Sequence, residues 1–198
     1  MNHYMEIIAA FLTGVIGPLI VQFYKTYRSI QLEKNKDHVA DQMPVQKQIE
    51  FKLEKLQEKY KSDRIWITQF HNGGTFYPSG KSIQKFSMFY EILNEGISPI
   101  KMIFQNIPVS LFTNSTDHIY HHNKLCIADF KDNTIPTYGL KYTAEETGCK
   151  SAYCFAMKDI NNKFIGILCV EYVKKRVRLE PEDITDLSLE SATIAGYL

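Results

Sequence analysis

The chain has 198 residues, 44% of them hydrophobic, and its 23 basic and 22 acidic residues give a net charge of +1. This balance argues against a broad basic face, so we expect no nucleic-acid partner. The length accommodates one domain with a helical connector. Four cysteines in a chain of this size do not indicate a disulfide scaffold, and free cysteines on apolar segments usually behave as small buried side chains.

The first element in the chain is an apolar run, Ile7–Tyr24, in which only Thr13 and Gln22 are clearly polar. Roughly 18 mostly apolar residues are enough to cross a bilayer as a helix. We therefore predict that residues 1–24 form a transmembrane anchor, which contacts membrane lipid through residues 7–24. Lys and Arg near a span favour the cytoplasmic side, so the cations that follow predict a single-pass inner-membrane protein with a cytoplasmic soluble domain. These cations are Lys25, Arg28, Lys34 and Lys36.

Three other interpretations of this run compete with an anchor. A signal peptide needs a basic segment before the apolar run and a small-residue cleavage site, and residues 1–6 contain no Lys or Arg. A buried core helix is compatible with the length and with a kink at Pro18, although Gly and Pro are also common in membrane helices. A helix that lies on the membrane surface needs a charged face, which this run lacks.

Residues 25–61 are predicted to form a charged helical connector, which Pro44 interrupts. Its second half carries an apolar stripe with two interpretations that the sequence leaves open. The stripe packs against its own domain, or it forms a short two-stranded coiled coil that makes a homodimer. The residues at this helical spacing are Val45, Ile49, Leu53, Leu56 and Tyr60.

Residues 62–198 are predicted to form one domain in which strands alternate with short helices. Helical spacing predicts a helix over Lys101–Phe112 that breaks at its proline, and Thr143–Gly148 is predicted as a helical turn closed by its glycine. The last helix is predicted over Glu180–Leu198. Segments rich in β-branched and aromatic residues predict five strands. They are Arg64–Phe70, Gln84–Leu93, Lys124–Phe130, Ala152–Lys158 and Phe164–Val173.

The last fifty residues combine a G-[IV]-L-x-[VI]-x-Y strand, an acidic helix start and a helix with an S-x-x-I-A-x-x-L pattern. The matching residues are Ile165, Gly166, Ile167, Leu168, Val170, Glu171 and Tyr172, then Glu180 to Asp183, then Ser191, Ile194, Ala195 and Leu198. This order resembles the end of a GAF domain, and the helix before Arg64 fits the long N-terminal helix of that family. The resemblance implies an α+β fold, with an antiparallel sheet of five or six strands flanked by helices. It also implies that the terminal helices cover one face and that a ligand pocket lies on the other.

The most unusual polar cluster is His71-Asn72-Gly73-Gly74, which directly follows a predicted strand. Its His and Asn can line a site to which two glycines allow close backbone approach, and a plain turn is the competing interpretation. On the next strand three polar residues share one face, and the resemblance places the pocket side within residues 95–150. The predicted ligand-binding residues are His71, Asn72, Tyr77, Lys85, Ser87, Tyr90, Tyr138, Tyr142 and Cys149.

Chemistry beyond ligand binding has little support in the sequence. His118, His121 and His122 lack Cys or carboxylate partners at zinc-site spacing, so a solvated loop is predicted there and no metal. No phosphate-binding, dinucleotide-binding or catalytic-serine motif is present. The sequence therefore identifies no cofactor, and we expect a binding module rather than an enzyme.

Three functions fit these features. The first is a membrane-anchored, GAF-like sensory or ligand-binding module that acts through dimerisation or partner contacts. The alternative is a phage-type membrane protein of lysis or superinfection exclusion, because a single N-terminal span, a charged helix and a compact domain are similar to the holin of T-even phages. The third is a redox enzyme similar to the GAF-like reductases of free methionine sulfoxide, with Cys126 and Cys149 as its cysteines.

Overall fold

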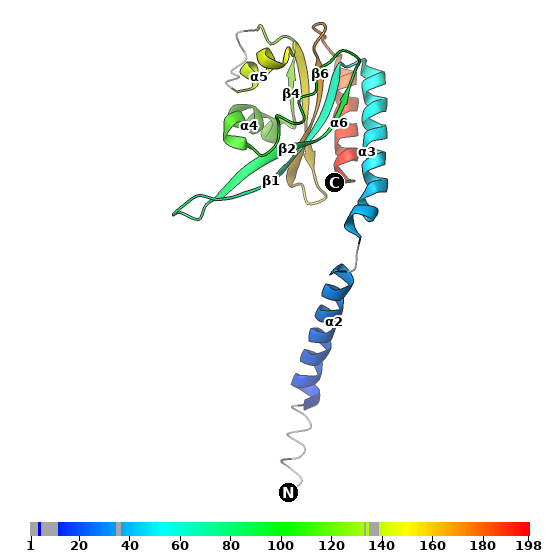
Figure 1. Cartoon of the computed structure of the whole chain (residues 1–198), viewed down its shortest axis with the longest axis vertical. Coiled ribbons are helices and arrows are strands. Elements are labelled where there is room, and N and C mark those ends of the chain that lie inside the picture. The colour runs from blue at the N-terminus through cyan, green and yellow to red at the C-terminus, as the bar shows by residue number, and fades with distance from the viewer. Residues whose placement is uncertain (1–3, 5–11, 35–36, 133, 135–138) are drawn as a thin grey trace. The chain divides into compact units, whose positions relative to one another are not determined.

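The computed structural model describes residues 4, 12–34, 37–132, 134 and 139–198 (Figure 1). The chain divides into two compact units, Met1–Val45 and Gln46–Leu198. The unit boundary falls inside a helix, so the helical residues from Gln46 onward belong to the same unit as the sheet.

The first unit contains a short π-helix, η1 (Leu12–Ile16), the helix α2 (Gly17–Lys34) and the first turns of α3 (His38–Tyr60). The predicted span, residues 7–24, lies partly outside the described residues, which begin again at residue 12. Within the part that is described, no helix combines the length and the apolar character that crossing a membrane requires. The predicted interruption at Pro44 is wrong, because this proline lies inside α3.

The second unit is built on a six-stranded sheet in which every neighbouring pair of strands is antiparallel. Its strand order is β3-β2-β1-β6-β5-β4, so the first long strand and the last one lie side by side at the centre. This confirms the predicted α+β class with an antiparallel sheet. The strands are β1 (Arg64–Thr75), β2 (Ser82–Leu93), β3 (Ile107–Pro108), β4 (Lys124–Ile127), β5 (Ser151–Lys158) and β6 (Phe164–Tyr172).

Helices cover both faces of this sheet (Figure 1). The helix α6 (Pro181–Ala195) and α3 lie side by side on one face. Lys52 of α3 pairs with Glu190 of α6 at 3.4 Å, and Lys59 pairs with Asp186 at 2.8 Å. The other face carries α4 (Thr113–His122), α5 (Leu140–Thr147) and the 3₁₀-helix η2 (Val109–Phe112). We call the two sides the helix-packed face and the cavity face.

The apolar stripe of α3 is buried within this unit, with Ile49 and Leu53 fully inaccessible to solvent. The helix therefore packs on its own domain, one of the two interpretations that the sequence left open. At the C-terminal end of α5, Gly148 has a φ of 70° and its N–H bonds to the carbonyls of Ala144 and Glu145. This confirms the predicted glycine closure of that helical turn.

Two predicted elements are wrong. Residues 101–112 form turns, the short strand β3 and η2 instead of a helix, and Pro108 pairs with Lys85 in extended backbone. The three histidines lie on α4 rather than in a loop. The sequence of α4 hides this helix, because Ile119 is its only buried large apolar residue and polar residues fill the rest.

The hairpin of β1 and β2 extends beyond the rest of the sheet as a two-stranded arm (Figure 1). The pairing of β1 with β6 ends at Gln69, whereas the pairing of β1 with β2 continues to Thr75 and Ser82. The sequence predicted a strand that ends at Phe70, because the Asn-Gly-Gly segment reads as a turn. In the structure these residues continue the strand, with a register irregularity between Asn72 and Thr75.

Candidate functional site

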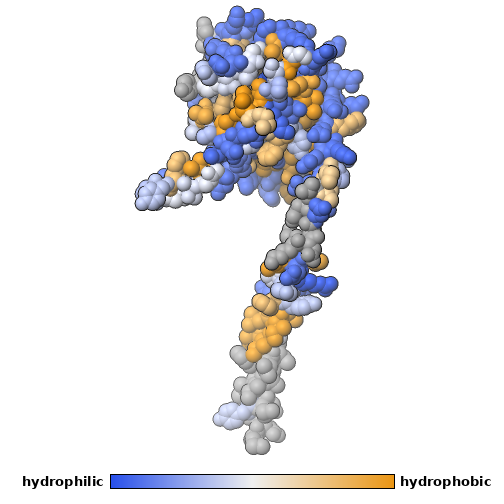
Figure 2. Space-filling model, in the orientation of Figure 1, coloured by the Kyte–Doolittle hydropathy of each residue, from blue (hydrophilic) through white to orange (hydrophobic). Residues whose placement is uncertain are grey.

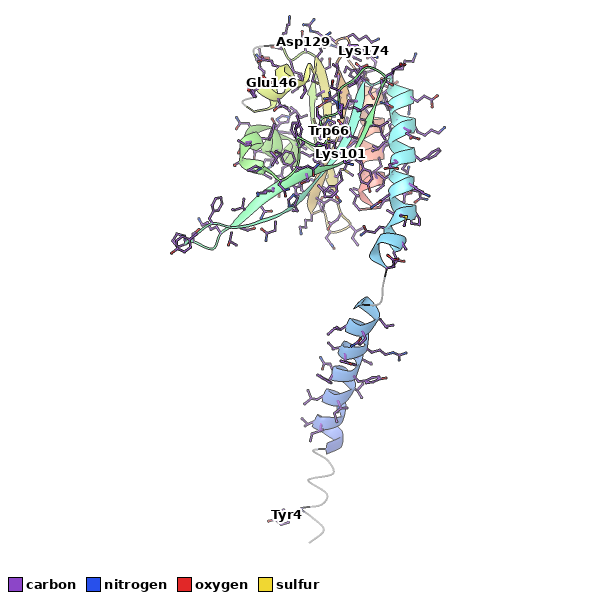
Figure 3. All side chains as sticks on the ribbon, viewed as in Figure 1. Tyr4, Trp66, Lys101, Asp129, Glu146 and Lys174 are labelled. Carbon is purple, nitrogen blue, oxygen red and sulfur yellow. The ribbon has the colours of Figure 1, made fainter. Side chains whose placement is uncertain are left out.

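The cavity face encloses a small cavity of about 60 Å³ between the sheet, α4, α5 and the segment that joins β2 to α4. We call this the inner cavity. Trp66 lines it, and Figure 3 shows this residue on the sheet, below the end of the domain that carries Asp129 and Lys174 in this view. The lining residues are Trp66, Thr68, Phe86, Met88, Ile100, Phe104, Phe112, Ser115, Thr116, Ile119, Leu140, Thr143, Cys154, Ile167 and Glu171.

Strand alternation explains why space remains on this face. Successive side chains of a strand point to opposite faces, and β5 alternates small residues with large ones. Ala152 and Cys154 belong to the core cluster of the cavity face, whereas Tyr153, Phe155 and Met157 point the other way and are buried. Small side chains under α4 and α5 leave the volume that becomes the inner cavity.

Two polar groups in this cavity lack a hydrogen-bond partner among the described residues. They are the indole nitrogen Nε1 of Trp66 and the hydroxyl Oγ of Ser115, both buried. The indole N–H approaches the carboxylate of Glu171 closely enough to lower its pKa, but it does not reach hydrogen-bond geometry. A buried donor without a partner costs about 1–3 kcal/mol, so these groups mark a place where an acceptor is missing.

Charged side chains close one end of the inner cavity. Arg64 Nη1 donates a hydrogen bond to Glu171 Oε2 at 2.7 Å, and Arg64 Nε lies 3.8 Å from Glu91 Oε1. All three side chains are more than nine-tenths buried. Burial raises the pKa of Glu171, and the charge of Arg64 is the strongest influence that opposes this rise. The carboxylate of Glu171 is the one of the two that lines the cavity.

An open groove of about 540 Å³ lies next to the inner cavity. Phe104, Phe112 and Thr143 line both spaces, so these three side chains stand between them. Figure 2 shows hydrophobic side chains gathered on this side of the domain, alongside α4. The groove is lined by Ile103, Phe104, Ile107, Leu111, Phe112, Gly139, Tyr142, Thr143, Glu146 and Thr147.

Gly139 fixes how closely α5 approaches the groove wall. Its φ is 87°, a conformation that favours glycine, and a Cβ atom there would lie 2.2 Å from the carbonyl oxygen of Leu111. The glycine therefore allows the start of α5 to pack against the backbone of η2. Its N-terminal neighbours, residues 135–138, lie outside the described part of the chain.

Of the ligand-binding residues predicted between positions 95 and 150, Tyr142 lines the groove. Tyr138 lies outside the described residues. Cys149 is buried in the core cluster of the cavity face, where its thiol donates to the carbonyl of Ser151 at 3.3 Å. Burial raises the pKa of this thiol, so it is not an activated nucleophile.

The other predicted residues lie away from the inner cavity. His71 and Asn72 are on the arm, where Asn72 Oδ1 accepts hydrogen bonds from Gly74 N and Ser82 Oγ. Tyr77 is 97% exposed at the tip of the arm.

Lys85, Ser87 and Tyr90 share a face, as predicted. Ser87 pairs with Gln69 and Tyr90 with Ile67, so the register places them on the helix-packed face, opposite the cavity. The register irregularity beside Tyr90 brings it onto the same face as Ser87 although the two are three positions apart. His71 Nε2 lies 2.9 Å from Ser87 Oγ, which ties the base of the arm to β2.

Sequence reasoning did not select three polar residues that line the cavity, Trp66, Ser115 and Glu171. Glu171 carried a signal, because it is a carboxylate inside an otherwise apolar strand, FIGILCVEY. Arg64 and Trp66 carried a similar signal, because they are polar or partly polar side chains that alternate with isoleucines at the start of β1. Ser115 carried no signal, since α4 itself was not predicted.

The structure offers no candidate metal centre among the residues that it describes. The four cysteines are all free, and the thiols of Cys154 and Cys169 face each other across β5 and β6 with a sulfur–sulfur distance of 3.0 Å. Burial raises the pKa of Cys169.

No protein-family model matches this chain, and no curated protein matches it. Solved structures do. The blue-light-absorbing form of the PixJ GAF domain from Thermosynechococcus elongatus has a TM-score of 0.62 and 14% identity, over 81% of this chain and 88% of that one. A far-red cyanobacteriochrome photoreceptor has a TM-score of 0.60 and 11% identity, over 89% of this chain and 95% of that one. The phycocyanobilin-bound GAF domain of a cyanobacterial phytochrome has a TM-score of 0.57 and 12% identity, over 79% and 85%.

At identities of 11–14% these structures establish the fold alone. The sheet with helices on both faces is GAF-like, as the resemblance in the last fifty residues implied. Function has to be argued from the residues of the site itself.

Proposed function

We propose that this chain is a GAF-like sensory module that binds a compact ligand in the inner cavity and the adjoining groove. The observation that supports this most strongly is the pair of unpartnered polar groups, the Trp66 N–H and the Ser115 hydroxyl, in an enclosed and mainly apolar space. A ligand that offers an acceptor there removes a cost of about 1–3 kcal/mol for each group it satisfies.

The size of the inner cavity bears on what the ligand is. One structure with the same fold is described as phycocyanobilin-bound. Pockets for drug-sized ligands measure about 300–1,000 Å³, and the inner cavity of this chain measures about 60 Å³. A ligand of this chain therefore places a small polar group in the inner cavity and its remaining atoms past Phe104 and Phe112, in the groove.

We propose further that the module signals as a homodimer through α3 and α6. Phe51 on α3 is 59% exposed and Leu189 on α6 is 65% exposed. The two side chains belong to neighbouring stretches of these helices, because the adjacent residues Lys52 and Glu190 form an ion pair. Exposed large apolar side chains on adjoining helices favour contact with a second copy.

The membrane tether is a proposal that rests on the composition of residues 7–24 and on the cations that follow them. A tether holds the module close to a membrane, which fits a sensor that passes its signal to membrane partners. The holin-like alternative has no observation in its favour beyond this N-terminal run.

Native mass spectrometry of the full chain, released from detergent, tests the ligand proposal. We expect a protein mass with a retained small molecule. Cys154→Leu adds two heavy atoms at the cavity wall and is expected to abolish the retained mass, whereas Cys126→Leu changes an exposed residue of β4 that lines neither space.

Two outcomes contradict the proposal. One is a retained molecule that survives Cys154→Leu, which would place the ligand elsewhere. The other is a chain that carries no small molecule and takes up none from a metabolite extract. Each needs the folded state of Cys154→Leu to be checked by circular dichroism, because overfilling a core costs about 1–3 kcal/mol. The native mass spectra also report how many copies of the chain associate. A chain that stays monomeric at high concentration contradicts the proposed homodimer.

A further inference from the structure

The charges around the inner cavity do not balance. Arg64 is the only cation in the buried cluster, and it faces the two carboxylates of Glu91 and Glu171. The cluster therefore carries one net negative charge when all three side chains are ionised. No Lys, Arg or His lines the inner cavity within the described chain.

The two carboxylates differ in how well they are satisfied. Glu91 accepts the backbone N–H groups of Ile100 at 2.8 Å and Lys101 at 3.0 Å, so both of its oxygens are occupied. Glu171 receives one hydrogen bond, from Arg64, and the Trp66 indole N–H lies close enough to lower its pKa without completing a second hydrogen bond. Its carboxylate borders the cavity. Burial of a carboxylate is costly unless charges or hydrogen bonds compensate it. Glu171 is therefore the less fully compensated of the two carboxylates, and it is the one that borders the empty space.

The remaining walls of the inner cavity are suited to a cation. Four aromatic side chains line it, and the faces of aromatic rings attract cations, with Trp the strongest. The Ser115 hydroxyl has no partner and can accept a hydrogen bond from an N–H group. The aromatic residues are Trp66, Phe86, Phe104 and Phe112.

We propose that the inner cavity receives the protonated amine of a small amphiphilic ligand, with Glu171 as its counter-ion and the apolar part of the ligand in the groove. This inference rests on the proposed ligand site and names the chemical class of its ligand. A water needs about 10–15 Å³ of such volume, so a cavity of about 60 Å³ holds an ammonium group and a few further heavy atoms. Phe104 and Phe112, whose ring centroids are 6.4 Å apart, then flank the ligand where it leaves the cavity.

The test compares two probes that differ only in their head group, 3-phenylpropan-1-amine and 3-phenylpropan-1-ol. Their dissociation constants are measured by titration calorimetry on the full chain in detergent at neutral pH. A hydrogen bond to a charged group contributes about 1.5–3 kcal/mol, so we expect the amine to bind at least about tenfold more tightly than the alcohol. Equal affinities overturn the inference and leave the proposed ligand site standing. Binding of neither probe contradicts both.

Variants then identify the counter-ion. Glu171→Gln is expected to bring the two dissociation constants within about twofold of each other, with the alcohol unaffected. This substitution leaves Arg64 paired with Glu91, so the net charge of the cluster changes from one negative charge to zero. Glu145→Gln removes an exposed carboxylate of α5 that lines neither space, and it is expected to keep the tenfold preference.

A different carboxylate can produce the same preference. Glu146 lines the groove, so an amine preference that Glu146→Gln abolishes and Glu171→Gln keeps overturns the inference. If Glu171→Gln does not fold, the ratio of the two probes on the unaltered chain still decides between an amine site and a neutral one.

Discussion

The two faces of the sheet are built from the same strands and differ in how completely they are filled. On the helix-packed face, β5 presents Tyr153, Phe155 and Met157, all of them buried, and α6 packs against this strand. On the cavity face the same strand presents Ala152 and Cys154. One face is a filled apolar core, and the other retains a cavity with a charged end. The contrast teaches that alternate residues of one strand build a filled core on one face and border an open space on the other.

Two buried serines show the same contrast between the faces. Ser191 of α6 is fully buried on the helix-packed face, and its hydroxyl donates to the carbonyl of Ala156 at 3.2 Å. Ser115 of α4 is buried on the cavity face without a partner. Native proteins satisfy most buried polar groups. Among the described residues, Trp66 Nε1 and Ser115 Oγ are unpartnered at the inner cavity, and Gln57 Nε2, Ser62 Oγ and Arg64 Nε are unpartnered elsewhere.

The largest expected effect is a loss of stability when a buried side chain of the filled face is truncated. Phe155 is fully buried, and Phe155→Ala removes most of a ring from a packed core, which costs about 3–5 kcal/mol. The neighbouring Cys154→Ala removes one sulfur atom beside an existing cavity and is expected to cost less than about 1.5 kcal/mol. Urea denaturation of the full chain measures both free energies of unfolding. Equal losses at the two positions would mean that the faces are equally well packed.

Two serine variants sharpen the comparison, because each is expected to change the free energy of unfolding by about 1 kcal/mol, in opposite directions. Ser191→Ala loses a satisfied hydrogen bond and leaves the Ala156 carbonyl with one partner fewer, so it is expected to destabilise the chain by about 1 kcal/mol. Ser115→Ala removes a hydroxyl that has no partner, so it is expected to stabilise the ligand-free chain by a similar amount. Thermal unfolding of both variants without ligand checks the signs. A loss of stability in Ser115→Ala would show that the hydroxyl is satisfied.

Titration gives opposite pH dependences on the two faces. Burial raises the pKa of Glu171 above its ordinary value of 4.5. The contribution of this side chain to stability is therefore full below that value and is lost as the pH rises through the raised pKa. Hydrogen bonds from Lys59 and Tyr60 lower the pKa of Asp186 below 3.8. Its contribution is present above pH 3.8 and is lost as the pH falls through the lowered pKa.

The free energy of unfolding is measured for the unaltered chain and for each variant over about five pH units, starting at about pH 3. The quantity compared is the value for the unaltered chain minus the value for the variant. For Glu171→Gln this difference is expected to fall as the pH rises. For Asp186→Asn it is expected to rise between about pH 3 and 5, by less than about 1 kcal/mol, because the carboxylate is partly exposed. A difference that stays level for Glu171→Gln would mean that Arg64 fully compensates the buried charge.

The sequence predicted the filled face well and the cavity face poorly, for a physical reason. The stripe of α3 has apolar residues at helical spacing, and β5 and β6 are runs rich in apolar residues. The helix α6 begins with a proline and acidic residues. Each of these signals is visible in the sequence. The cavity face is built by short helices and turns whose sequences are polar, such as α4. Such short polar elements leave no periodic apolar pattern in the sequence.

The predicted site residues on the arm lie apart from the inner cavity for a similar reason. The Asn-Gly-Gly segment of the arm reads as a turn beside a pocket, yet it forms the free end of a hairpin. Whether a polar cluster faces a cavity depends on which strands pair beside it. That pairing brings together residues about a hundred positions apart, such as Arg64 and Glu171.

The smallest expected effects come from two tyrosine variants, which test whether the arm or the groove contacts the ligand probe. Tyr77 is almost fully exposed at the tip of the arm, so Tyr77→Ala is expected to change neither the stability beyond about 0.5 kcal/mol nor the affinity for 3-phenylpropan-1-amine. Tyr142 lines the groove, and Tyr142→Ala is expected to weaken that probe by about threefold, because part of the apolar wall is lost. Calorimetric titration of both variants, with the unaltered chain as reference, measures the ratio. If Tyr77→Ala weakened the probe more than Tyr142→Ala, the arm rather than the cavity face would hold the ligand, and the residues that the sequence predicted on it would be the site.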